Sequence, residues 1–187
     1  MKKFKEYAAP TVVLFTICVV AAFLLALTNK VTAEPIAQVN ADNEAKARTV
    51  VFADADHFGD PVETKAECVN SVVPALDAGD NVIGYVVTSY DEKGYGGKIT
   101  VMTGVDKDGK VTGVSILDMS ETAGLGANAK RESFREQFIG KIKNITVSKD
   151  EPGENAIDAL TGATITSRAV TRAVNAAVEA AGGANNG

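Results

Sequence analysis

The sequence predicts an α+β fold, a mostly antiparallel sheet with flanking helices, preceded by one transmembrane helix. The middle of the 187-residue chain holds short runs rich in valine, isoleucine and tyrosine, joined in pairs by turn sequences. Such pairs form β-hairpins. Helical patterns lie at both ends of the chain, and helices placed apart from hairpin-paired strands are typical of the α+β class. A long uncharged run near the N-terminus predicts the membrane helix.

The first element is the uncharged run at residues 8–29. At about 1.5 Å per residue it spans about 33 Å, which matches a hydrocarbon core of about 30 Å. Three lysines precede it and only Lys30 follows closely, so the positive-inside rule predicts a cytoplasmic N-terminus and an extracytoplasmic domain. A cleaved signal peptide is the competing interpretation, because residues 31–33 (VTA) resemble a cleavage site. Lys30 and the length of the run favour a retained anchor in the inner or plasma membrane.

The chain is expected to have five parts. They are a cytoplasmic N-terminus (1–7), the transmembrane anchor (8–29), a stalk (30–38), an extracytoplasmic domain (39–182) and a flexible tail (183–187). The composition is globular, with 45% hydrophobic residues, and the part after the anchor is long enough for one domain with its own core.

The strands of this domain are predicted from two hairpins. Residues 68–76 and 81–90 are separated by DAGD, and residues 98–105 and 111–118 by DKDGK. The Asp-Gly pair of the second connection is a strong signal for a tight turn. A further strand is predicted over residues 142–148, followed by a loop that contains Pro-Gly.

The helices of the domain are predicted at residues 40–52, 130–139 and 168–181. The last has apolar residues at i, i+4, i+7 and i+8, which gives it one buried face. Thr166 or Ser167 is the expected N-cap, because a hydroxyl oxygen there accepts a bond from an unpaired backbone N–H. Gly182 and Gly183 are expected to end the helix.

Composition excludes several classes of site. The net charge is −5, so nothing indicates nucleic-acid binding. His57 is the one histidine, and the cysteines Cys18 and Cys68 form no CxxC motif, so iron–sulfur ligation and structural zinc are not expected. The aspartates of residues 54–60 could bind a hard cation, but a solvated loop is the simpler interpretation. No metal site is predicted.

Three loops could hold a ligand. The glycines of GYGG (94–97) allow a close approach of backbone to a ligand, or simply connect two strands. The loop SETAGLGANA (120–129) contains G-x-G-x-x-A, but a Rossmann site requires a βαβ unit, which hairpin-paired strands do not supply. A loop packed against a planar ligand is the better functional interpretation. In residues 158–169 (DALTGATITSRA), Thr164 precedes the predicted helix, where a phosphate is favoured.

Residues 158–164 match the flavinylation motif D-x-x-[ST]-G-A-T, in which a flavin transferase joins FMN through a phosphoester to the last threonine, here Thr164. The anchor, GYGG and ETAGLG also match in order. Together they resemble a family of FMN-binding subunits, which includes RnfG of the Rnf electron-transport complex and NqrC of the Na⁺-translocating NADH:quinone reductase. The resemblance spans nearly the whole chain, and its compact length is more similar to the Rnf member. One departure is Ala123, where the family usually has proline.

The resemblance implies that residues 39–182 are an FMN-binding domain and that the chain is a covalent flavoprotein and phosphoprotein. FMN would be esterified to Thr164, and the transferase would read the motif residues before it. The other expected cofactor contacts lie in the two glycine loops. By the resemblance, the site residues beside Thr164 are Asp158, Thr161, Gly162, Ala163, Thr122, Leu125, Tyr95 and Gly96. No catalytic residue is expected.

The resemblance further implies an electron-relay subunit of an ion-translocating ferredoxin:NAD⁺ oxidoreductase, a translocase, with no complete activity of its own. The expected partners are the membrane, the other Rnf subunits, which include membrane, iron–sulfur and flavin subunits, and a flavin transferase for maturation. Two alternatives stay open. One is a membrane-anchored extracytoplasmic binding module without a redox role, and the other is a stand-alone flavoprotein reductase.

Overall fold

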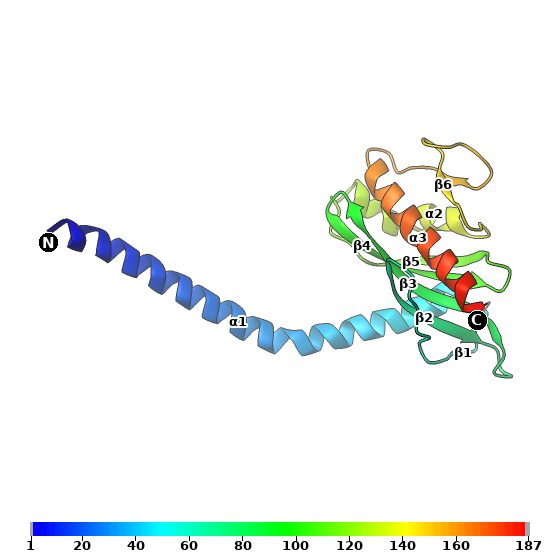
Figure 1. Cartoon of the computed structure of the whole chain (residues 1–187), viewed down its shortest axis with the longest axis horizontal. Helices are drawn as coiled ribbons and strands as arrows, with labels where there is room; N and C mark the ends of the chain where they lie inside the picture. The colour runs from blue at the N-terminus through cyan, green and yellow to red at the C-terminus, as the bar shows by residue number, and fades with distance from the viewer. Residues whose placement is uncertain (1, 186–187) are drawn as a thin grey trace. The chain divides into compact units, whose positions relative to one another are not determined.

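A computed structural model describes residues 2–185 of the chain. The chain divides into two compact units, Met1–Asn43 and Glu44–Gly187. Helix α1 (Lys2–Val51) runs through the first unit and ends in the second (Figure 1). The predicted anchor, the predicted stalk and the helix predicted at 40–52 therefore form one continuous helix. Pro35 removes one backbone donor but does not end the helix.

The first unit consists of α1 alone among the described residues. From Pro10 onward this helix is long and apolar enough to cross a membrane, and its most apolar window is wholly exposed. A helix meets the main requirement for crossing a bilayer, because its backbone N–H and C=O groups are paired within the helix.

The second unit is built on a five-stranded sheet in which neighbouring strands follow one another in sequence and all pair antiparallel (Figure 1). The strands are β1 (His57–Phe58), β2 (Val69–Leu76), β3 (Val82–Gly94), β4 (Gly97–Asp106) and β5 (Val111–Asp118). Both predicted hairpins and the α+β class are confirmed. In the β4–β5 turn, the Asp106 carboxylate accepts bonds from the N–H groups of Asp108 and Lys110 at 2.9 and 2.8 Å.

The two faces of the sheet have separate cores, because successive side chains of a strand point to opposite faces. Helix α3 (Thr164–Asn185) packs on β3 and β4. Its fully buried alanines, such as Ala173, let the helix lie close to the sheet, and the Ser89 hydroxyl donates to the Ala173 carbonyl at 2.8 Å. The opposite face packs on the end of α1, where Val51 and Phe52 are buried with Val86 and Met102.

Several sequence predictions differ from the structure. The helix predicted at 130–139 is three short pieces, η1 (Gly126–Lys130), α2 (Glu132–Arg135) and η2 (Glu136–Phe138). The strand predicted at 142–148 is wrong except for β6 (Thr146–Val147), which pairs in parallel with β7 (Ala156–Ile157). Asn144 has φ +62°, which interrupts an extended chain, and the N–H of Ile145 donates to the side chain of Asn175 on α3 instead of to a strand.

Helix α3 is also longer than predicted at both ends. It begins at Thr164 instead of residue 168, and it continues through Gly182 and Gly183. Glycine lowers helix propensity by only about 1 kcal/mol. The buried face of Ala180 and Ala181 holds the last turns against the rest of the domain, so this cost does not end the helix.

Candidate functional site

A pocket of about 520 Å³ lies where the three ligand loops of the sequence meet. It is lined from the β3–β4 turn, the loop after β5, the first turn of α3 with the residues before it, and one residue between β6 and β7. The lining residues are Tyr95, Glu121, Thr122, Leu125, Gly126, Lys149, Gly162, Ala163, Thr164, Ile165 and Thr166. Segments distant in sequence thus form one site.

Thr164 is the first residue of α3 and its side chain is partly exposed in this pocket. The Lys149 ammonium group donates to the Thr164 hydroxyl at 3.4 Å. A helix N-terminus and a lysine therefore meet at one hydroxyl, and both favour a negatively charged group. Sequence reasoning missed Lys149, because a lone lysine in a polar loop 15 residues before Thr164 carries no signal of its own.

The expected N-caps have other roles. Thr166 and Ser167 lie inside α3, so the prediction that one of them caps the helix is wrong. The Thr166 hydroxyl donates to the Glu121 carboxylate at 2.9 Å. The Ser167 hydroxyl accepts a bond from the N–H of Leu160 at 2.9 Å and donates to the carbonyl of Ala163 at 3.0 Å. Ser167 thus ties the motif loop to the helix that follows it.

Glu121 is a second residue that sequence reasoning missed. Besides the bond from Thr166, its carboxylate accepts a bond from the backbone N–H of Gly96 at 3.2 Å. The signal was present in the sequence, because this glutamate begins ETAGLG, but glutamate in a loop is usually a solvated residue.

The motif residues before Thr164 divide into two groups. Gly162 and Ala163 line the pocket, whereas Asp158 and Thr161 do not. Gly162 has φ +74°, which other residues adopt only with strain, and a Cβ there would lie 3.1 Å from the Leu125 side chain. Asp158 accepts a bond from the Ser148 hydroxyl at 2.8 Å, and both Asp158 and Thr161 are exposed.

The glycine loops supply four predicted contacts, and three of them line the pocket. Tyr95 and Leu125 line it with 72% and 44% of their surface exposed, and Thr122 lines it beside them. Gly96 is not a lining residue. A Cβ there would lie 1.9 Å from the Ser120 carbonyl oxygen, so the glycine is required by close packing of two loops. The antiparallel strands around these loops also exclude a Rossmann arrangement in the described residues.

Two ion pairs attach α3 to its surroundings near the pocket. Arg168 binds Asp150, the neighbour of Lys149, through two nitrogens, and this bond lowers the pKa of Asp150 below its usual range. Arg172 binds Asp91 on β3 with nitrogen–oxygen distances of 2.7 and 2.8 Å. Burial raises the pKa of Asp91, but the bonds from Arg172 and the N–H of Lys93 outweigh it, so the pKa is lowered.

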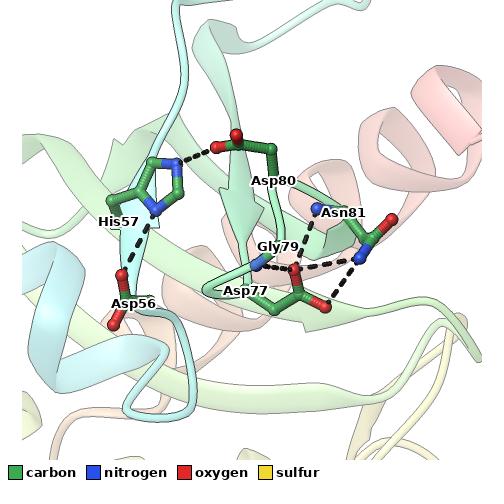
Figure 2. Close-up of polar contacts among 6 residues, drawn as sticks. All are labelled: Asp56, His57, Asp77, Gly79, Asp80 and Asn81. Atoms are coloured by element: carbon green, nitrogen blue, oxygen red, sulfur yellow. Dashed lines mark hydrogen bonds and ion pairs between the residues drawn. The ribbon is translucent and has the colours of Figure 1, made fainter.

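The aspartates around His57 form no metal centre. His57 lies 2.9 Å from Asp80 and 3.5 Å from Asp56, and the nearby Asp77 carboxylate accepts bonds from the backbone of its own turn (Figure 2). Within residues 2–185, no group of three or more histidine, cysteine, aspartate or glutamate side chains is placed to hold a metal ion.

Comparison with known proteins agrees with this arrangement. Residues 94–179 match the family model "FMN-binding domain". The chain is 40% identical over 163 residues to the G subunit of the proton-translocating ferredoxin:NAD(+) oxidoreductase complex of Clostridium ljungdahlii, which covers 87% of this chain and 84% of that protein. It is 37% identical over 182 residues to the G subunit of the Na(+)-translocating complex of Acetobacterium woodii, covering 89% and 87%.

Solved structures show the same fold. The NqrC protein of the Na(+)-translocating NADH-quinone reductase of Parabacteroides distasonis matches with a TM-score of 0.52 at 20% identity, over 75% of this chain and 80% of that one. NqrC of Shewanella oneidensis matches with a TM-score of 0.51 at 19% identity, over 73% of each chain. The identities to the two G subunits are high enough, over most of both chains, to show membership: this chain belongs to the G-subunit family of ion-translocating ferredoxin:NAD(+) oxidoreductase complexes.

Proposed function

We propose that this chain is a membrane-anchored electron relay that carries FMN esterified through its phosphate to Thr164. The observation that carries the proposal is the pocket itself, in which the last threonine of the flavinylation motif lies together with both glycine loops. The match to an FMN-binding domain supports the same cofactor.

The residues of the pocket fit FMN. Thr164 offers a partly exposed hydroxyl, and Lys149 supplies a cation 3.4 Å from it, which would balance the phosphate charge. The N-terminus of α3 adds unpaired N–H groups at the same place. Tyr95 and Leu125 offer apolar surface for a planar ring. When bound, FMN supplies the electron-transfer chemistry, while the chain supplies position and electrostatics.

The kind of complex in which this relay would act is inferred from the names of the relatives. They are named as subunits of ion-translocating ferredoxin:NAD(+) oxidoreductase complexes. We propose the same for this chain, with the remaining subunits of such a complex as electron donor and acceptor. The two names give different ions, proton and Na⁺, so the proposal assigns none. The N-terminus would lie in the cytoplasm and the pocket outside it, because lysines precede the apolar part of α1.

The test is the intact mass of the denatured full chain after co-expression with an active flavin transferase. The proposal predicts a gain of one FMN less one water, located by peptide fragmentation at Thr164. The Thr164→Ala chain should keep its fold and gain no mass. As a matched control, Thr64→Ala changes an exposed threonine outside the pocket and should be modified like the wild type.

An unmodified wild-type chain, with the transferase shown to be active on another substrate, would overturn covalent attachment and leave the membrane-anchored binding module as the better interpretation. Turnover of an external acceptor by the isolated flavinylated chain would instead indicate a stand-alone reductase. A relay, in contrast, requires one partner subunit as electron donor and another as electron acceptor.

A further inference from the structure

We propose that Glu121 is a positioning residue that holds the three segments of the pocket together and lowers the reduction potential of the flavin through its negative charge. The second part rests on the proposed function, that is, on FMN at Thr164. The first part concerns the chain alone and is tested without a flavin.

Glu121 connects segments that are distant in sequence. It lies on the loop after β5, and its two carboxylate oxygens accept bonds from two other elements. Oε1 accepts from the N–H of Gly96 in the β3–β4 turn at 3.2 Å. Oε2 accepts from the hydroxyl of Thr166 in the first turn of α3 at 2.9 Å. Thr166 is 1% exposed, so its hydroxyl depends on this partner.

The glycines of both loops leave the space that this carboxylate occupies. A Cβ at Gly94 would lie 2.8 Å from Oε1, and a Cβ at Gly126 would lie 2.4 Å from Oε2 and 2.6 Å from the Thr166 hydroxyl. At Gly126 the carboxylate of Glu121 is the nearest atom, whereas at Gly94 the backbone carbonyl of Gly97 is nearer still. Close packing of the loops and of Glu121 thus accounts for both glycines without a ligand, and a larger side chain at Gly126 would press directly on the Glu121 carboxylate.

The charge of Glu121 has no counter-charge of its own. No ion pair to it exists among the described residues, and both of its donors are neutral groups. Among the residues that line the pocket, Lys149 is the one with a cationic side chain. Its ammonium group lies at Thr164, where it would pair with the phosphate of FMN and not with Glu121. A fixed negative charge therefore faces the rest of the pocket.

A flavin in this pocket would be reduced less readily because of that charge. Reduction delivers electrons to the ring, and a fixed negative charge nearby opposes the added negative charge. Partial burial strengthens this effect relative to water, because screening is weaker.

The experiment compares full-length wild-type, Glu121→Gln and Glu121→Ala chains, each co-expressed with the flavin transferase. Glutamine has the same size and can accept a bond through its amide oxygen, but it is neutral. Glu121→Gln should take up FMN like the wild type and show a midpoint potential shifted to more positive values. Glu179→Gln removes the same charge 15 residues after Thr164 on α3, about 22 Å along the helix, and should leave the potential unchanged.

Amide hydrogen exchange of the chains made without transferase tests the positioning. The Gly96 N–H should exchange about tenfold faster in Glu121→Ala than in the wild type, as expected for the loss of one hydrogen bond, and should stay protected in Glu121→Gln. Equal exchange at Gly96 in wild type and Glu121→Ala would overturn the positioning role. An unchanged potential in flavinylated Glu121→Gln, or failure of that variant to take up FMN when the wild type does, would overturn the proposal. If the wild type takes up none, the proposed function fails, while the exchange result still stands.

Discussion

Replacement of Ser167 by alanine removes the hydroxyl that joins the flavinylation motif to α3. In the wild type, this fully buried hydroxyl accepts a bond from the N–H of Leu160 at 2.9 Å and donates to the carbonyl of Ala163 at 3.0 Å. In Ser167→Ala, the partly buried N–H of Leu160 has lost its acceptor, and the loop keeps only the backbone bond from the N–H of residue 167 to the carbonyl of Ala163.

The expected loss of stability follows from these contacts. An N–H group left without a partner costs about 1–3 kcal/mol, and the higher helix propensity of alanine offsets at most about 0.5 kcal/mol. We therefore expect Ser167→Ala to lower the free energy of unfolding by about 0.5–2.5 kcal/mol. The control is Thr171→Val, which has nearly the same shape. It loses one bond of 2.8 Å to the Ser167 carbonyl, and that carbonyl keeps its helix partner, so the loss should be below about 1 kcal/mol.

Urea unfolding of the full chain in mild detergent, followed by far-ultraviolet circular dichroism, measures both variants. The midpoint should fall while the slope stays that of the wild type. Amide exchange should show faster exchange at Leu160 in Ser167→Ala alone. The reasoning is refuted if Ser167→Ala lies within about 0.5 kcal/mol of the wild type, or if Thr171→Val costs more than Ser167→Ala.

Two further perturbations test the surroundings of the pocket. The lowered pKa of Asp91 means that its pair with Arg172 contributes stability above the ordinary value of 3.8 and loses it as the pH falls through the lowered pKa. Asp91→Asn should therefore show a smaller difference in urea midpoint between about pH 7 and about pH 3 than the wild type, and an equal difference would contradict this. Gly126→Ala places a Cβ 2.4 Å from a carboxylate oxygen and should destabilise the chain by about 1–3 kcal/mol. Gly153→Ala meets nothing within 4 Å and should stay within about 0.5 kcal/mol; equal losses in both would refute the packing argument.

Local patterns predicted the hairpins well. The β2–β3 and β4–β5 pairs follow from apolar β-type runs around tight turns, and both signals lie within a few residues of each other. The prediction of a strand at 142–148 was mostly wrong, because the isoleucines of this segment do not set its backbone conformation. Asn144 adopts φ +62°, and Ile145 exchanges bonds with Asn175 of α3 through both its N–H and its carbonyl, a partner 30 positions away.

The start of α3 is a second case in which contacts distant in sequence outweigh a local pattern. A hydroxyl at Thr166 or Ser167 satisfies every local rule for an N-cap. The structure extends the helix to Thr164 instead, because both hydroxyls find partners in other segments, Glu121 and the loop at Leu160. Helix propensity takes no account of those partners, because they become neighbours only after the chain folds.

The sequence by itself determined the antiparallel α+β fold, the long apolar N-terminal segment, the family and the three loops that supply most of the pocket. Each of these depends on residues that are close in the chain, or on a motif read in order. The tertiary structure alone decided which side chains of those loops, and of other segments, face one another. Lys149 at Thr164, and Glu121 between Gly96 and Thr166, join positions 15 to 45 apart. Such contacts depend on the geometry of packed elements, and no periodicity or spacing encodes that geometry.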